Sequence, residues 1–296
     1  MPISGATLAA NLGLGWVMAI TTVLVHLNDK RRAQALAAAA VAIARPAAAH
    51  VIGLHVAPSL PAMTTLAIPY GDDMVDAVRR AEARDSEAIA GIFRDATAAA
   101  PEHATWLSGV PPGADIAAFV MQHGRTADLI VAAEADPSWD LAPVLDFPER
   151  LVMESGRPVL LVPNAGRFGQ PPRHAVLAWN GRREASRAAF DALACIDRAC
   201  RVTILVIEED GAATLARESA EAMKLTAERH GFSATVVRTG LVGRAIGAAI
   251  VAETAKLGGD LLVMGAYGHS RIREFVLGGA TRHVMHQMPC PTLVSH

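Results

Sequence analysis

Short apolar runs alternate with longer, alanine-rich or amphipathic runs along most of the chain. Residues 22–27 (TVLVHL) and 50–56 (HVIGLHV) are mostly apolar, and residues 31–44 between them have a composition that favours a helix. Strands that are apolar on both faces are typical of a parallel sheet covered by helices on both sides. The pattern therefore predicts an α/β fold in which strands and helices alternate.

The alternation continues to residue 163 and predicts five strands and four helices before that point. Pro58, Pro61 and Pro69 break up a loop after the second strand, and Asp72 or Asp73 can cap the helix that follows the loop. The further strands are predicted at residues 104–107, 128–132 and 158–162, and the further helices at residues 72–100, 114–123 and 143–154.

The same order then repeats after residues 164–172 (NAGRFGQPP), which have the glycine, proline and polar content of a linker. The run DLIV at Asp128 aligns with DLLV at Asp260, and PVLLV at Pro158 aligns with PTLV at Pro291. This internal repeat predicts two copies of one unit. The strands of the second copy are predicted at residues 175–179, 201–207, 233–237, 261–264 and 291–294, and its helices at residues 184–195, 211–229, 242–256 and after Gly278.

We therefore expect two tandem, doubly wound five-stranded parallel sheets with helices on both faces. This is a Rossmann-like arrangement, because right-handed crossovers leave few other topologies. The predicted divisions of the chain are an N-terminal extension at residues 1–17, a first copy at residues 18–163, a linker at residues 164–172 and a second copy at residues 173–296.

The N-terminal stretch is uncharged, since no acidic or basic side chain precedes Asp29, and a membrane span is an alternative for such a stretch. Asn11 and Gly13 interrupt its apolar character, and no basic segment precedes it as an export signal requires. Residues 22–27 also match a later strand, HAVLAW at residues 174–179. We therefore expect neither a membrane segment nor an export signal, and a cytoplasmic protein.

The charge balance and the cysteine pattern argue against several functional classes. With 27 Lys and Arg against 29 Asp and Glu, no global field steers the chain to nucleic acid, and 4% aromatic residues leave few platforms for bases. Cys195, Cys200 and Cys290 form neither a paired framework nor a C-x-x-C motif. We expect buried structural thiols in a reducing compartment.

Residues 260–296 point most clearly to a ligand site. A predicted strand ends near Gly265, Gly268 follows it, and Gly278 precedes a helix. Glycines at the end of a strand let the backbone approach a ligand closely, and the amides at a helix start favour an anion. At these residues the chain resembles the universal stress protein family, whose nucleotide-binding members carry G-x2-G-x9-G-[ST]. Here the final Ser/Thr position is Gly279.

The resemblance covers nearly the whole chain as two copies and implies the strand order 3-2-1-4-5 in each. It implies that the ligand is ATP or a related adenine nucleotide, with or without Mg²⁺. It also implies pairing through the fifth strands, which would join residues 158–162 to residues 291–294 within one molecule and cover two exposed sheet edges. We therefore expect a monomer that contains a pseudo-dimer, with a homo-oligomer as the alternative.

Further residues would surround the nucleotide on the same resemblance. In nucleotide-binding relatives an acidic residue follows the first strand near the adenosine, and here that position is Asn180 in the second copy and Asn28 in the first. Thr281 matches a hydroxyl that is often present in relatives and would contact phosphate. Met264 and Ile207, at the ends of their strands, would either pack against a base or belong to the sheet core.

Polar residues in and after the glycine loop have two interpretations each. His269 and Arg271 lie inside the loop, where the planar guanidinium of Arg271 would pair with phosphate or lie in solvent. His283 and His286 are three residues apart on a predicted helix, a spacing that allows zinc binding. No cysteine or carboxylate completes a recognisable set of ligands, so we interpret these two as solvated histidines.

The first copy lacks the motif. Ala133, Asp136 and, approximately, Leu145 stand where the second copy has its three motif glycines. A carboxylate repels phosphate, and Ala or Leu denies the backbone approach that glycine allows. We therefore expect the first copy to be a structural unit that has lost the site, or to bind something else, and the second copy to hold the nucleotide site.

Three functional hypotheses follow. The first is a stress-response binding module that holds an adenine nucleotide as a regulatory ligand. The second is an interaction or scaffold protein, or a binder of a small apolar ligand, that uses no nucleotide and recruits unknown protein partners. The third is a slow ATP hydrolase, for which the loop offers no metal-holding carboxylate apart from the nearby Glu274. The sequence has no P-loop, no G-x-G-x-x-G motif after either first strand, and no H-E-x-x-H motif.

Overall fold

The structure of the protein is a computed structural model. It describes residues 20–57, 72–111, 115–138, 146–166, 168–208, 213–241, 243–266 and 279–296. We call the part from β1 to β5 the first half and the part from β6 to β10 the second half.

The first half alternates strands and helices as predicted. Its strands are β1 (Thr22–His26), β2 (His50–Val56), β3 (Ala104–Gly109), β4 (Leu129–Ala133) and β5 (Val159–Val162). Its helices are α2 (Lys30–Ala44), α4 (Asp72–Thr97), α5 (Ile116–Gly124) and α7 (Pro148–Glu154), with short 3₁₀ turns at Arg45–Ala47 and Pro101–His103.

The second half repeats this order. Its strands are β6 (His174–Ala178), β7 (Arg201–Glu208), β8 (Ala234–Gly240), β9 (Leu261–Gly265) and β10 (Thr292–Ser295). Its helices are α8 (Arg183–Cys195), α9 (Ala213–Arg229), α10 (Ile246–Lys256) and α11 (Gly279–His286).

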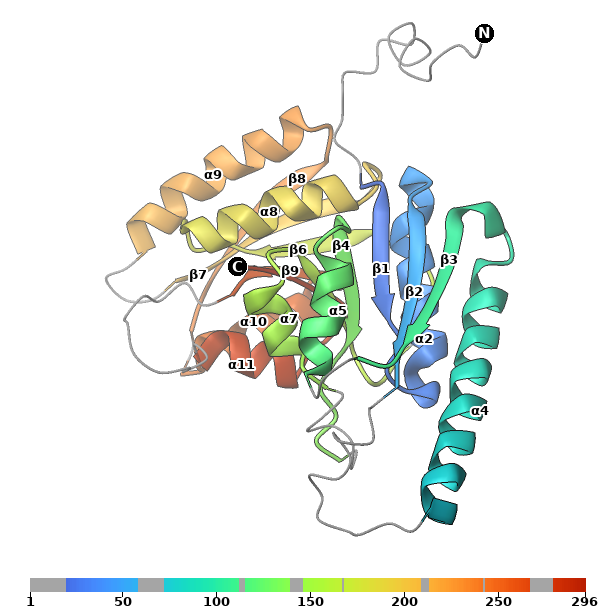
Figure 1. Ribbon diagram of the computed structural model, residues 1–296. Coiled ribbons are helices and arrows are strands. Elements are labelled where there is room, and N and C mark those ends of the chain that lie inside the picture. The colour runs from blue at the N-terminus through green and yellow to red at the C-terminus, as the bar shows by residue number, and fades with distance from the viewer. Residues whose placement is uncertain are drawn as a thin grey trace, which may run out of the picture.

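All ten strands form one continuous sheet in the order β3-β2-β1-β4-β5-β10-β9-β6-β7-β8 (Figure 1). Each half has the predicted order 3-2-1-4-5, and the strands within each half are parallel. The predicted pairing of the fifth strands is also confirmed, because β5 and β10 are antiparallel neighbours with Leu160 opposite Leu293. The halves therefore point their C-terminal strand ends in opposite directions.

Helices cover both faces of the sheet (Figure 1). Residues that point to one face, such as Val23 and Val25, pack with α2, α4, α8 and α9. Those that point to the other face, such as Leu24, pack with α5, α7, α10 and α11. Strands buried on both faces explain why their sequences are apolar without alternation.

In both halves, an aspartate forms hydrogen bonds with the backbone at the start of the first strand. The Asp128 carboxylate accepts hydrogen bonds from the backbone N–H groups of Thr21 and Thr22, at 2.7 and 3.0 Å. The Asp260 carboxylate does the same for Arg173 and His174, with bonds of 2.8–3.1 Å. The aligned DLIV and DLLV runs therefore share an aspartate that holds two parallel strands together.

Two predicted helix starts are wrong. The helix predicted from residue 143 begins at Pro148, which follows the N-cap Phe147 and suits the first turn of a helix. The helix predicted from residue 242 begins at Ile246, because Gly243 has a φ of +72° and Ala245 is extended. β8 is also longer than the predicted 233–237, and it pairs with β7 as far as Gly240. These shifts leave the topology unchanged.

The predicted burial of the cysteines is confirmed, since Cys195, Cys200 and Cys290 are all buried and free. Burial raises the pKa of the Cys200 and Cys290 thiols to about 12. In the described part of the chain, no helix is both long and apolar enough to cross a membrane. The predicted extension at residues 1–17 lies outside the described residues.

Candidate functional site

Several predicted site residues lie at the C-terminal ends of β6, β7 and β9. Ala178 of β6 pairs with Met264 of β9 and with Leu205 of β7, so Asn180, Ile207 and Gly265 follow at nearly the same level. The connections from β6 and β9 leave in opposite directions along the sheet, which makes this the switch point where ligands bind in such folds.

The individual environments of these residues differ. Met264 is buried, and Ile207 packs against the same apolar cluster under α10 and α11, so both belong to the sheet core. Asn180 is exposed, and its side-chain oxygen accepts the backbone N–H of Arg182 at 3.0 Å. Asn180 therefore stabilises the turn that leads into α8, and its side chain is uncharged.

Gly265 is in close contact with the first turn of α8. A Cβ added at this position would lie 2.5 Å from the backbone nitrogen of Ala185 and 2.6 Å from the carbonyl oxygen of Glu184. Contacts below 3.0 Å force the backbone to move. A glycine is therefore required here for helix–strand packing, whether or not a ligand approaches.

Gly279 and Thr281 lie at the start of α11. A Cβ added at Gly279 would lie more than 4 Å from every atom of the described residues, whereas Thr281 is buried. α11 is held close to α10, because a Cβ at Gly247 would lie 2.7 Å from the Cβ of His283 and 2.9 Å from the carbonyl oxygen of Ala280. The other predicted loop residues lie outside the described residues: Gly268, His269, Arg271 and Gly278.

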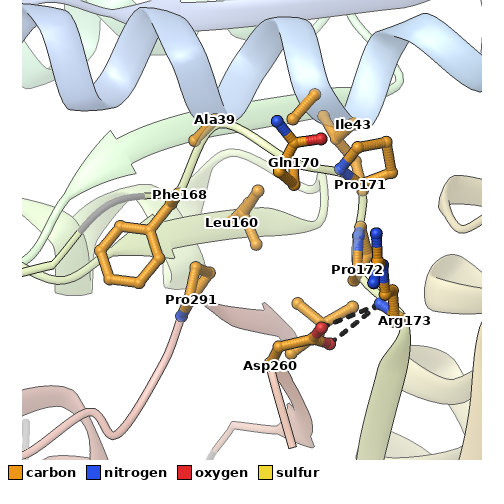
Figure 2. A pocket seen from close by; sticks show the side chains of 12 residues that line it. Ala39, Ile43, Leu160, Phe168, Gln170, Pro171, Pro172, Arg173, Asp260 and Pro291 are labelled. Carbon is orange, nitrogen blue, oxygen red and sulfur yellow. Dashed lines mark hydrogen bonds between the residues drawn. The ribbon is translucent and has the colours of Figure 1, made fainter.

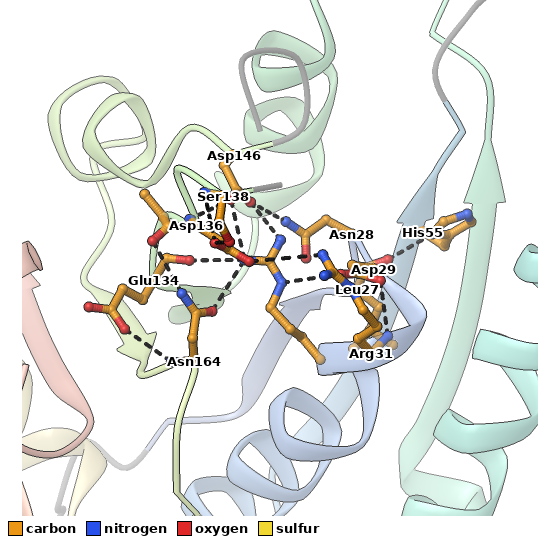
Figure 3. A network of polar contacts seen from close by, with 12 residues as sticks. Leu27, Asn28, Asp29, Arg31, His55, Glu134, Asp136, Ser138, Asp146 and Asn164 are labelled. Atoms are coloured by element: carbon orange, nitrogen blue, oxygen red, sulfur yellow. Dashed lines mark hydrogen bonds and ion pairs between the residues drawn. The ribbon is translucent and has the colours of Figure 1, made fainter. Parts of the chain in front are cut away.

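In the first half, a network of polar contacts joins the segments that follow β1 and β4 (Figure 3). From the first turn of α2, Arg32 Nη2 contacts Asp146 Oδ1 at 2.8 Å, and Nη1 donates to the backbone oxygen of Glu134 at 3.0 Å. Asn28 Nδ2 and the backbone N–H of Asp136 also donate to the Asp146 carboxylate, at 2.6 and 2.8 Å. The side chains of Arg32 and Asp146 are 9% and 3% exposed, so this ion pair is part of the interior.

His26 lies next to this network, at the C-terminal end of β1. It is the last residue of β1 and 2% exposed, and its ring stacks on Phe147 with centroids 5.2 Å apart. Burial, followed by the nearby His55 and Arg32, lowers the pKa of His26 to about 3, so the ring is neutral at neutral pH. A stack of a neutral imidazole on a phenyl ring and a buried ion pair thus lie at the C-terminal strand ends of the first half.

The structure also places the predicted histidine pair. His283 is half-buried against α10 and His286 is exposed. No group of three metal-ligating side chains occurs among the residues that the structure describes.

Comparison with known proteins agrees with this arrangement. Residues 176–296 match the model of the Universal stress protein family. The second half is a universal stress protein domain. No curated protein sequence matches the chain.

Solved structures resemble the chain over both halves. A universal stress protein from Archaeoglobus fulgidus DSM 4304 has a TM-score of 0.65 at 15% identity, covering 93% of this chain and 95% of its own. A protein of unknown function from Pseudomonas aeruginosa PAO1 has a TM-score of 0.54 at 14% identity, with coverages of 94% and 93%. A candidate universal stress protein from Pseudomonas aeruginosa UCBPP-PA14 has 0.54 at 15% identity, with 94% of both chains covered. At these identities the likeness establishes the fold.

The sequence prediction for the first half missed Arg32 and Asp146. A signal for Arg32 exists, since it lies four residues before Leu36 on the buried face of an alanine-rich helix. An arginine on such a face needs a buried partner. The partner, Asp146, is distant in sequence, and no local pattern identifies it.

Proposed function

We propose that the universal stress protein domain binds ATP or a related adenine nucleotide as a regulatory ligand, outside the C-terminal ends of β6 and β9. The observation that carries this proposal is the contrast between the C-terminal strand ends of the two halves. In the first half, the buried Arg32–Asp146 ion pair and the His26–Phe147 stack lie at the C-terminal ends of β1 and β4. In the second half, the position of His26 is held by Ala178, and a Cβ added at Gly279 would lie more than 4 Å from every atom of the residues that the structure describes.

The described residues fit a phosphate-bearing ligand. Gly279 begins α11, and the N–H groups and dipole at the start of a helix favour negative charge. The side chain of Asn180 can donate and accept hydrogen bonds near a ribose or base. Thr281, Met264 and Ile207 would support this site from the core, and the predicted loop residues would complete it.

Binding is better supported than hydrolysis. A hydrolase needs a carboxylate or similar group that holds the metal ion or orients water. Glu208, at the end of β7, contacts Arg217 at 2.6 Å, and Glu184, at the start of α8, is paired with Arg183. Both carboxylates face arginines, so a Mg²⁺ ion would have to compete with a guanidinium group for either of them.

The same proposal includes a cellular role and place. A regulatory nucleotide in one half of a pseudo-dimer suits a stress-response protein that changes its interactions with protein partners. The three buried, unpaired cysteines support a reducing compartment, and we place the protein in the cytoplasm.

Calorimetric titration with ATP, in the presence and absence of Mg²⁺, tests the proposal. We expect one nucleotide per chain. Gly279→Asp should weaken binding at least tenfold, about 1.4 kcal/mol, because a carboxylate at the helix start repels phosphate while remaining compatible with the helix.

Gly279→Ala is the matched control, since it adds a side chain at the same position without charge and should bind more tightly than Gly279→Asp. Mass spectrometry of nucleotide released from the denatured protein provides an independent measurement. A folded wild-type protein that neither carries nor binds nucleotide would overturn the proposal, as would equal affinities for both variants.

A further inference from the structure

A pocket of about 390 Å³ lies at the junction of the two halves (Figure 2). We call it the junction pocket. Its inner wall consists of buried apolar side chains from α2, from β5 and from the starts of β9 and β10, and its rim is formed by the segment that leads into β6. The inner wall comprises Ala39, Ala42, Ile43, Leu160, Leu261 and Pro291, and the rim Phe168, Gln170, Pro171, Pro172, Arg173 and Asp260.

The volume arises from the small side chains of α2 and from the course of the segment before β6. Ala39 and Ala42 present methyl groups where larger apolar residues would fill the space. Gly166 has a φ of +117° and lies against the ring of Phe168, which turns this ring toward the pocket rim. Gly169 then brings the segment to the surface of α2, where its added Cβ would lie 3.5 Å from the Cβ of Ala38. Both halves and their connection thus build the pocket.

The two charged residues at the rim have different roles. Asp260 accepts backbone N–H bonds from Arg173 and His174 at 2.8–3.1 Å, so its carboxylate is already used to hold the start of β6. The guanidinium of Arg173 forms no ion pair with any residue that the structure describes, and Arg173 is exposed. The rim therefore presents a cation that is available to an anionic group.

We propose that the junction pocket binds a small apolar organic acid, whose carboxylate pairs with Arg173 and whose apolar part lies against Ala39, Ile43 and Leu160. Apolar pockets of 300–1,000 Å³ with a few polar groups that fix orientation are typical small-molecule sites, and a guanidinium pairs with a carboxylate through two parallel hydrogen bonds. The pocket is separate from the proposed nucleotide site, because Leu261 begins the strand that Gly265 ends. The proposal does not depend on nucleotide binding.

Two fluorescent probes of nearly the same shape test this assignment. 1-Anilinonaphthalene-8-sulfonate is an apolar anion, and N-phenyl-1-naphthylamine is its neutral counterpart. We expect the anionic probe to bind the folded wild-type protein at one site per chain and to be displaced by decanoate. Arg173→Gln should lower the affinity for the anionic probe about tenfold, because the ion pair with its sulfonate is lost. The affinity for the neutral probe should stay unchanged.

Arg229→Gln is the matched control, since it removes the same charge from the exposed end of α9 and should change neither affinity. Ala42→Leu, a substitution in the inner wall, should lower the affinity for both probes, because the larger side chain fills part of the pocket. The proposal is overturned if the anionic probe shows no saturable binding, or if Arg173→Gln and Arg229→Gln behave alike. Loss of binding of the neutral probe in Arg173→Gln would also overturn the proposal, because Arg173 would then maintain the shape of the pocket and not pair with the acid.

Discussion

Two neighbouring arginines show how position alone decides what a residue does. Arg31 and Arg32 are consecutive in α2, yet the side chain of Arg31 is 59% exposed and that of Arg32 is 9% exposed. The helical repeat turns Arg32 toward the sheet, where Asp146, Asn164 and the carbonyl oxygen of Glu134 accept its hydrogen bonds. The network replaces the water that a charged group loses on burial.

Removing the buried arginine should therefore destabilise the protein strongly. We expect Arg32→Met to lower the free energy of unfolding by about 3–5 kcal/mol, because the Asp146 carboxylate would remain buried without its cation. Arg31→Met should change it by less than about 1 kcal/mol, since exposed ion pairs contribute little. Urea denaturation of the two variants measures the difference, and equal midpoints would show that the pair is not a buried structural element.

His26 should make the stability fall in mild acid. Its pKa is lowered from 6.5 to about 3 in the folded state, so below pH 6.5 the unfolded chain binds a proton that the folded chain does not. The stabilisation is complete above pH 6.5 and is lost between pH 6.5 and about 3, at up to about 1.4 kcal/mol per pH unit.

Replacing this histidine isolates its contribution. His26→Gln should flatten the decline of unfolding free energy between pH 6.5 and 5, where few carboxylates titrate. His103→Gln, at an exposed position, should leave the decline as it is in the wild type. An unchanged decline in His26→Gln would contradict the buried, neutral state of this ring.

At the level of elements, repetition in the sequence made most of the fold predictable. All ten strands, the strand order in each half and the β5–β10 pair follow from apolar runs, their repeat and a family resemblance. The ends of helices were less predictable where a backbone conformation outside the helical range set them, as at Gly243 before α10. The candidate site was predictable only in part, because the Arg32–Asp146 pair and the junction pocket depend on contacts between distant segments.

The close approach of α8 to β9 is an element-scale contact that one glycine permits. The equivalent residue in the first half is Ala133, so α2 must lie farther from the end of β4 than α8 lies from β9. We expect Gly265→Ala to lower the free energy of unfolding by about 2 kcal/mol, because the added methyl group overlaps backbone atoms that cannot turn away.

Gly279→Ala provides the comparison, since its methyl group would lie more than 4 Å from every atom in the described part of the chain and alanine favours a helix. Its unfolding free energy should remain within about 1 kcal/mol of the wild type or rise slightly. Thermal and urea unfolding of both variants measure this. A Gly265→Ala protein as stable as Gly279→Ala would mean that α8 can move, and that packing against α8 does not require a glycine at position 265.

At the scale of the whole molecule, the antiparallel β5–β10 pair joins the halves into one sheet and uses the two edges that a single copy would leave open. Val159, Leu161, Leu293 and Val294 along this pair are buried. The outer strands, β3 and β8, contain half-buried and exposed residues and Gly109 and Gly240 at their ends, which makes them poorer templates for another chain. The chain thus satisfies internally the contact that would otherwise require a second copy.

We therefore expect a monomer of 31.0 kDa in sedimentation equilibrium, with a mass that stays constant over a wide range of protein concentration. Dimers held through β5 or β10 would need the internal pair to open first, and its opening would expose the apolar centre of the sheet to water. A mass of two chains that persists on dilution would contradict this expectation. It would place a further interface on β3, β8 or the helical faces, because the central pair is already occupied.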